Sequence, residues 1–211
     1  MNDTVTALAD DLALLLLDEQ GQWATRRNLD GLFAVTLMVE LAHLDRLELF
    51  DEDNRVFVED DSPTGSAALD EALATLEQAK GSVIKDAIAA LAPGQKDRVL
   101  SRLAEQGAVE KRTERKRLIF TSTTWLLADT ARRDEVKARL RPLLFDEPDG
   151  AGRDEVFIAL LSAGGMVKSV AGRSKSAARI AEEVWARETV AHEIVSAGVQ
   201  GSNEGIMPNL M

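Results

Sequence analysis

The sequence lacks cysteine and tyrosine altogether, and aromatic residues make up only 4% of its 211 residues. The absence of cysteine excludes disulfides, thiolate metal sites and a cysteine nucleophile, and it is compatible with a reducing compartment. Because aromatic side chains are scarce, aliphatic side chains must fill the core. The longest apolar run near the N-terminus, residues 12–17, is much shorter than the roughly 20 residues that cross a bilayer. We also expect no signal peptide, because no basic region and cleavage site begin the chain.

Motifs typical of enzymes are also missing from the sequence. Its two histidines, His43 and His192, are isolated and lack the spacing of a metal motif. The glycines of residues 150–154 and 162–165 do not follow a strand and open a helix, as a dinucleotide-binding motif requires. No Walker-type loop and no nucleophile elbow occurs. We therefore expect no catalytic residue, no metal site and no cofactor, and a protein that is not an enzyme.

The charge of the chain is strongly negative but unevenly distributed. The formal net charge of −11 argues against nucleic-acid or anionic-lipid binding by the whole surface. Residues 96–141, however, contain 13 basic and 7 acidic residues, so this stretch carries +6 and the remainder carries −17. An acidic protein with one basic third has a place for an anion.

Residues 29–47 predict the helix around which the chain is organised. Apolar residues occupy nearly all sides of this stretch, and only Thr36 and Glu40 interrupt them between residues 32 and 42. A helix that is apolar all round is buried in protein or in lipid, and this one is too short and too charged for lipid. Asn28 or Asp30 can cap its start. We expect Glu40 to have a hydrogen-bonding or ionic partner rather than a catalytic role, since an unpaired buried charge is costly.

The remaining pattern predicts a mainly α-helical, single-domain bundle around this central helix, with short β-hairpins that include one projecting basic hairpin. We assign residues 1–200 to the domain and 201–211 to a flexible tail. Strands are expected at 47–50 paired with 55–58, and at 108–111 paired with 117–121. Further helices are expected at residues 3–17, 66–80, 82–91, 96–106, 130–144, 153–162 and 174–197.

The second hairpin carries the strongest functional pattern. Basic residues stand beside apolar ones, and the set comprises Lys111, Arg112, Arg115, Lys116, Arg117, Leu118 and Ile119. A basic and apolar ribbon can bind anionic lipid, where each Lys or Arg near the surface contributes about 1 kcal/mol. Three alternatives remain: a surface hairpin that packs on the body with solvated charges, a winged helix that binds DNA, and a hairpin that docks a partner chain or a second subunit.

A smaller polar stretch precedes the central helix. Trp23, Arg26 and Arg27 could offer a stacking surface and donors for an anion. The simpler interpretation is an amphipathic loop tryptophan with two solvated arginines.

Several segments in order resemble the Golgi phosphoprotein 3 family, and in particular its actinobacterial members. The matching segments are DDLALLLLDEQG at 10–21, VELAHLDRLEL at 39–49, DSPTGSAALDEAL at 61–73, DRVLSRLAEQGAVEK at 97–111 and TTWLLAD at 123–129. The PTG-x-x-x-LDEAL pattern is the most specific of the set. The resemblance implies a mainly helical domain ringed by amphipathic helices. Eukaryotic members of the family bind phosphatidylinositol 4-phosphate in a basic pocket, insert a hydrophobic hairpin into the membrane and hold cytosolic tails of Golgi glycosyltransferases.

The family pocket combines a tryptophan before the central helix, an arginine inside it and arginines at the start of the helix before the hairpin. Here Lys96 stands at the place of a pocket arginine and Arg98 at a basic position, whereas Pro93 and Ala34 replace the other two arginines. Trp23 lies earlier than the family tryptophan. Lysine offers a point charge and not a bidentate fork, so these departures weaken the expected phosphoinositide pocket.

The resemblance and the charge pattern together predict a cytoplasmic, peripherally membrane-associated protein that binds anionic lipid. The headgroup residues would be Trp23, Arg26, Arg27, Lys96 and Arg98. Homo-oligomerisation through the hairpin and binding of cytosolic tails of membrane proteins are further expectations. No nucleic-acid partner is expected.

Overall fold

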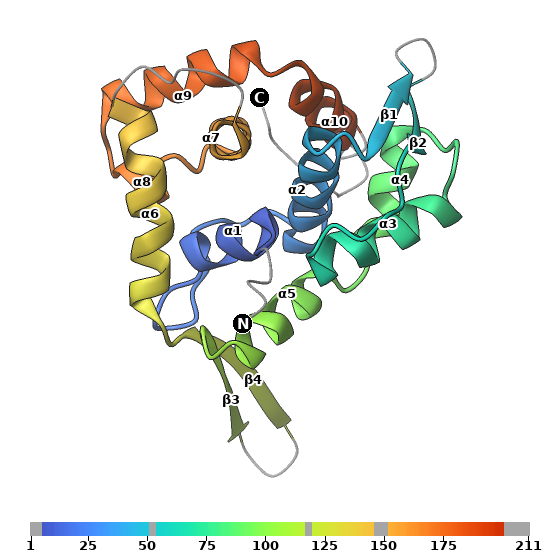
Figure 1. Cartoon of the computed structure of the whole chain (residues 1–211). Helices are drawn as coiled ribbons and strands as arrows, with labels where there is room; N and C mark the ends of the chain where they lie inside the picture. Colours follow the sequence, from blue (N-terminus) through green and yellow to red (C-terminus); the bar gives the residue numbers. More distant parts are fainter. Residues whose placement is uncertain (1–5, 51–53, 117–119, 146–151, 201–211) are drawn as a thin grey trace.

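The computed structural model describes residues 6–50, 54–116, 120–145 and 152–200 (Figure 1). Helices dominate, as predicted, and two antiparallel hairpins accompany them. The helices are α1 Leu8–Leu16, α2 Leu29–His43, α3 Ala67–Gln78, α4 Ile84–Leu91, α5 Gln95–Glu105, α6 Thr130–Phe145, α7 Arg153–Ala163, α8 Lys168–Ala171, α9 Lys175–Arg187 and α10 Thr189–Gln200. The strands are β1 Leu47–Phe50, β2 Arg55–Val58, β3 Val109–Lys116 and β4 Phe120–Leu127.

Helix α2 lies inside the bundle, as its all-round apolar sequence predicts. Every residue from Gly31 to Ala42 is buried, and α2 packs against α1, α3, α4, α5, α7 and α10. Its start is capped by Asn28, whose Oδ1 accepts hydrogen bonds from the backbone N–H groups of Asp30 and Gly31. It ends at His43 and not at residue 47, because Asp45 has a positive φ of 55° and the chain then enters β1.

Two further helices share the interior with α2. All nine residues of α1 are buried, and α7 is buried from Glu155 to Leu161. In Figure 1 these three helices lie inside a ring formed by the other helices. Buried apolar side chains from Ala7 to Val195 form one contiguous cluster.

Two sequence predictions of secondary structure are wrong. The helix expected at 174–197 is two helices, because Glu188 has an extended backbone with ψ of 98°. The break lets α9 pack on α7 and α6, whereas α10 packs on α2 and α4. The second hairpin is longer than expected, since its strands pair from Val109 with Leu127 to Lys116 with Phe120. The β-branched and aromatic residues of β4 favour a strand along this whole length.

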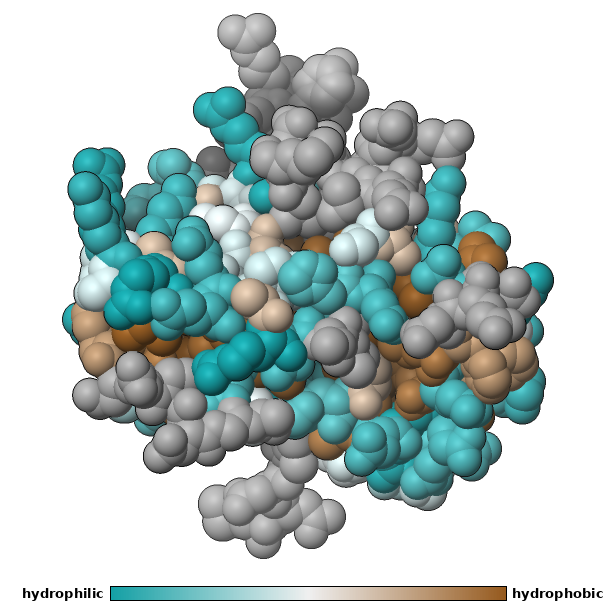
Figure 2. Space-filling view, turned by 90° about the horizontal axis from the view of Figure 1, so that it is seen from above, coloured by the Kyte–Doolittle hydropathy of each residue, from teal (hydrophilic) through white to brown (hydrophobic). Residues whose placement is uncertain are grey.

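The β3–β4 hairpin projects from the helical body (Figure 1). The turn between α1 and α2 packs on the base of this hairpin, where the Leu127 N–H donates to the Asp18 carbonyl with 3.1 Å between the two atoms. Figure 2 views the molecule from above, where hydrophilic residues alternate with smaller hydrophobic patches, as on the surface of an ordinary globular protein. Within the described residues, no helix is long and apolar enough to cross a membrane.

Candidate functional site

Three arginines of the basic stretch 96–141, namely Arg102, Arg133 and Arg139, are paired with acidic residues of the α1 region, and Arg139 also pairs with Asp154. The local charge of +6 therefore does not form one basic surface. The ion pairs and their N–O distances are Arg102–Asp10 at 2.8 Å, Arg139–Asp11 at 2.6 Å, Arg139–Asp154 at 2.8 Å and Arg133–Glu19 at 3.3 Å.

Glu40 lies in the same buried ionic layer, and its predicted partner is present. Arg153 from α7 places Nη2 2.6 Å and Nε 2.8 Å from Glu40 Oε1, and the Leu8 N–H donates to Oε2 at 2.7 Å. Burial raises the pKa of Glu40, although the charge of Arg153 and the hydrogen bond from Leu8 act in the opposite direction. Burial likewise raises the pKa of Asp10 and of Asp11, although their partners Arg102 and Arg139 lower it. These groups tie α1 and α2 to α5, α6 and α7.

An open cavity of about 370 Å³ lies between the α1–α2 loop and the turn that joins α7 to α8. Arg26 and Arg27 line it, as does Lys168 from the start of α8, together with Ala24, Thr25, Gly164, Gly165 and Met166. Arg26 and Lys168 are exposed, and Arg27 is half-buried. We call this space the loop cavity. It brings together two of the residues that the sequence predicted and one that it did not.

The guanidinium of Arg27 is partly buried, and one of its nitrogen atoms lacks a hydrogen-bond partner among the described residues. Its Nη1 atom is buried without a hydrogen-bond partner among the described residues, and burial lowers the pKa of its guanidinium. Its backbone N–H donates to Thr25 Oγ1 at 3.2 Å, which fixes the loop locally. An unpaired cation that is partly removed from water is the kind of group that an incoming anion stabilises.

The three other predicted headgroup residues do not line the loop cavity. The Trp23 ring packs edge-on against Phe33, with 6.2 Å between the ring centroids. Arg98 Nη2 donates to the Pro93 carbonyl at 2.8 Å, and this hydrogen bond stabilises the turn before α5. The Lys96 backbone N–H donates to Asp30 Oδ1 at 2.7 Å, which ties the start of α5 to the start of α2.

The position of the family arginine in the central helix is closed to solvent here. Ala34 is fully buried within α2. With alanine at this place, the helix contributes apolar packing and no cationic side chain to any surface pocket.

The β3–β4 hairpin presents part of its predicted basic set to solvent. Lys111 and Arg112 are exposed, and Lys111 Nζ lies 5.4 Å from the centroid of the Trp125 ring. Arg115 and Lys116 belong to the paired part of β3. Arg117, Leu118 and Ile119 lie outside the described residues.

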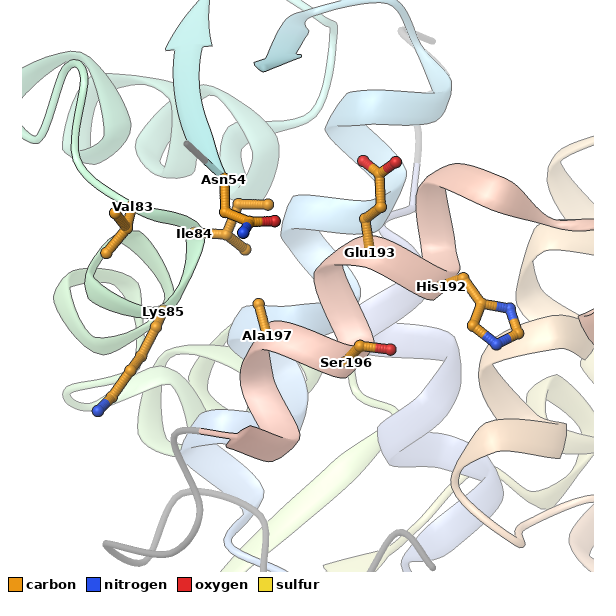
Figure 3. Close-up of a pocket in the computed structure, with 8 residues that line it drawn as sticks. All are labelled: Asn54, Val83, Ile84, Lys85, His192, Glu193, Ser196 and Ala197. Atoms are coloured by element: carbon orange, nitrogen blue, oxygen red, sulfur yellow. The ribbon is translucent and has the colours of Figure 1, made fainter. Parts of the chain in front are cut away.

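A larger cavity of about 430 Å³ lies between α10 and the chain at the starts of β2 and α4 (Figure 3). Figure 3 shows the side chains of Lys85, His192 and Glu193 pointing in different directions. The His192 imidazole stacks on Trp185, with 4.0 Å between the ring centroids. These groups therefore do not converge on one point, as catalytic groups must. Among the described residues, no group of acidic and histidine side chains is arranged to hold a metal ion.

The sequence prediction missed Lys168 and the basic residues that follow it. Residues 156–181 contain four basic residues and no acidic residue. This run of basic residues could have indicated a second basic region, but the charge count above covers only residues 96–141.

Comparisons with known proteins bear on the whole chain. A family model described as Golgi phosphoprotein 3 (GPP34) matches residues 8–200. A search of curated proteins finds no significant match.

Proposed function

The chain belongs to the Golgi phosphoprotein 3 family, and from this premise we propose that it is a non-enzymatic, peripheral membrane protein that binds anionic lipid headgroups. The observation that carries the proposal is the projecting β3–β4 hairpin with its exposed Lys111 and Arg112 (Figure 1). These cations are solvent-exposed, whereas Arg102, Arg133 and Arg139 of the same basic stretch are paired with carboxylates. Coulomb attraction to an anionic bilayer would act first on such exposed charges.

The loop cavity supports the same proposal. Its arginines follow the turn that packs on the base of the hairpin, so one segment connects the two basic features. Phosphatidylinositol 4-phosphate is the first lipid to test, because eukaryotic members of the family bind it. The absence of arginine at Ala34 and Pro93 favours weaker or different headgroup selectivity.

Co-sedimentation with vesicles tests the proposal. We expect the protein to bind vesicles that contain phosphatidylinositol 4-phosphate or another anionic lipid at low salt, and to dissociate as salt screens the charges. Lys111→Glu with Arg112→Glu should abolish most of this binding. The matched control is Lys80→Glu with Arg179→Glu, which changes the net charge equally at exposed positions in the turn after α3 and on α9. Absence of binding at low salt, or equal loss in both double variants, would contradict the proposal.

A protein-interaction scaffold is the second candidate function. The β3–β4 sheet has only two strands, so each strand has an outer edge to which another chain could add. Such an edge could join two subunits or hold the cytosolic tail of a membrane protein. A mass that rises with concentration in light scattering, and no longer rises after deletion of the hairpin, would favour this function over lipid binding.

A further inference from the structure

The loop cavity differs from the other cationic sites of the molecule because no carboxylate among the described residues lines it. Arg26, Arg27 and Lys168 bring three positive charges to one open space of about 370 Å³. By contrast, Arg102, Arg139 and Arg153 each lie within 3 Å of a carboxylate oxygen, and the distances are 2.8, 2.6 and 2.6 Å. In a chain of net charge −11, a cluster of cations without an acidic partner in the described part of the chain marks a site for an external anion.

A second cavity continues the basic surface. It has a volume of about 320 Å³ and shares Gly165 and Lys168 with the loop cavity. Arg173 and Lys175 line it, and Glu182 is the one carboxylate in its described lining. Lys168 therefore lies between the two cavities, and basic side chains line them from the α1–α2 loop to the start of α9.

The surroundings of Arg27 indicate from which side a partner must come. Besides the loop cavity, Arg27 borders an apolar void of about 10 Å³ lined by aliphatic residues such as Leu12, Leu32 and Val195. A void needs about 10–15 Å³ and several polar partners to hold a water molecule. The void is therefore a poor place for a compensating water. Of the two described spaces that Arg27 borders, the open loop cavity is therefore the one from which a partner can reach its guanidinium.

The dipole of α7 opposes anion binding in the loop cavity. The C-terminus of α7 ends at this cavity, and a helix C-terminus carries about half a negative charge. The N–H groups of Gly164, Gly165 and Met166 are already bonded to carbonyls of the last turn. Three full positive charges nevertheless outweigh half a negative one. Binding must therefore rely on side chains, and the Thr25 hydroxyl, which accepts from Arg27 N–H, still has its own hydrogen to donate.

We propose that the loop cavity binds a phosphate monoester group through Arg26, Arg27 and Lys168. A phosphate monoester carries close to two negative charges and three acceptor oxygens, which suits two planar guanidinium donors and one ammonium better than a singly charged diester. The group can belong to a lipid headgroup, in which case the inference rests on the proposed membrane function, or to a soluble phosphorylated compound.

Calorimetric titration of the full chain with glycerol 3-phosphate and with inorganic phosphate tests the soluble source. Arg26→Gln and Lys168→Gln change exposed side chains and should each weaken binding about tenfold to hundredfold, the effect of losing a hydrogen bond to a charged group. The matched control is Arg179→Gln, an exposed cation on α9 that lines neither cavity, and it should leave binding unchanged.

Arg27→Met provides a second readout, because it keeps the aliphatic stem and removes the uncompensated charge. In phosphate-free buffer this variant should melt at the same temperature as the natural protein or higher. Phosphate should raise the melting temperature of the natural protein, relative to chloride at equal ionic strength, but not that of Arg27→Met. If Arg27→Met fails to fold, the Arg26 and Lys168 variants still decide the outcome.

Vesicles of phosphatidic acid, a monoester, and of phosphatidylglycerol, a diester, test the lipid source at matched lipid content. Preference for phosphatidic acid that is lost in Lys168→Gln supports the site, with or without soluble binding. Soluble binding without vesicle binding supports the site and contradicts the membrane function. Equal binding of both lipids without soluble binding, or a preference that Lys168→Gln does not change, overturns the phosphate site while leaving membrane binding intact.

Discussion

Arg153 and Arg27 show how differently two arginines of this chain are placed. Arg153 holds both Nη2 and Nε within 2.8 Å of Glu40 Oε1, so its charge is neutralised inside the fold. Loss of one partner from a buried pair typically costs about 3–5 kcal/mol, because the other charge is left buried and uncompensated. Arg27 has no such carboxylate among the described residues, and its burial is a cost that the fold tolerates. The first arginine stabilises the fold, and the second is available to a ligand.

Glu40 gives a pH-dependent prediction. Its pKa in the folded protein lies above its ordinary value of 4.5 because it is buried. The folded state therefore binds the proton more tightly than the unfolded state, and this contribution to stability is present below pH 4.5 and disappears as pH rises through the raised pKa. Glu40→Gln should cost about 1–3 kcal/mol, since the amide replaces one of two accepting oxygens with an NH2 group that faces a donor. The cost should be larger below pH 4.5 than at neutral pH.

Urea denaturation of the natural protein and of Glu40→Gln across this pH range measures the difference. Glu71→Gln, at an exposed position of α3, serves as the control and should change stability by no more than a typical surface substitution. A cost of Glu40→Gln that grows with rising pH would contradict the raised pKa.

At this scale the sequence predicted that Glu40 has a partner, but not which one. Arg153 lies 113 residues away, and nothing in local periodicity links the two positions. Lys168 was missed for a related reason. It reaches the loop cavity only because the turn after α7 lies against the α1–α2 loop, an arrangement set by helix packing and not by neighbouring residues.

Among the elements, the turn between α1 and α2 connects the bundle to the projecting hairpin. Gly21 has a φ of 77°, and a Cβ atom built there would lie 2.7 Å from the Trp125 carbonyl oxygen and 2.4 Å from Thr124 Cγ2. Only glycine therefore fits both the backbone conformation and the close approach of β4. Residues 23–27 follow directly, so the same turn sets the position of Arg26 and Arg27.

Gly21→Ala should destabilise the protein by about 1–3 kcal/mol, because it adds backbone strain and a clash at one position. It should also weaken vesicle binding by shifting the loop relative to the hairpin. Thermal denaturation and co-sedimentation together measure these effects. Gly107→Ala, also at positive φ but with no atom within 4 Å of its added Cβ, isolates the contribution of strain alone. Equal effects of the two substitutions would contradict the role of the close contact.

The elements themselves were largely predictable because most are bounded by local chemistry. The hairpin of β1 and β2 has the predicted strands, and Asn28 caps α2 as expected. The break at Glu188 was not predictable, since the flanking residues favour helix on both sides. It results from packing, because α10 turns to contact α2 and α4.

For the whole molecule, the uneven charge has a geometric consequence for membrane binding. Among the described residues, exposed cations without a nearby carboxylate occur on the hairpin, the α1–α2 loop and the segment from Lys168 to Lys175, whereas Lys80 and Arg179 lie beside glutamates on an otherwise acidic chain. A single anionic bilayer would attract the first set and repel the remainder. The protein should therefore bind in one preferred orientation.

Hydrogen–deuterium exchange with and without anionic vesicles tests this orientation. Exchange should slow in residues 23–27, in residues 164–175 and in the described part of β3. It should remain unchanged in β1 and β2, which lie at the opposite end of the molecule from the projecting hairpin in Figure 1. Slower exchange in the first hairpin with none in the second would contradict the proposed orientation.

The buried ionic layer also constrains how the chain can fold during synthesis. The acidic residues of α1 and α2 find their arginines 92, 128 and 113 residues later, in α5, α6 and α7. A ribosome adds about 5–20 residues per second, so α1 waits on the order of ten seconds for its last partner. During that interval its leucine-rich surface is exposed without the helices that cover it. We expect the nascent chain to depend on molecular chaperones until α7 has been synthesised.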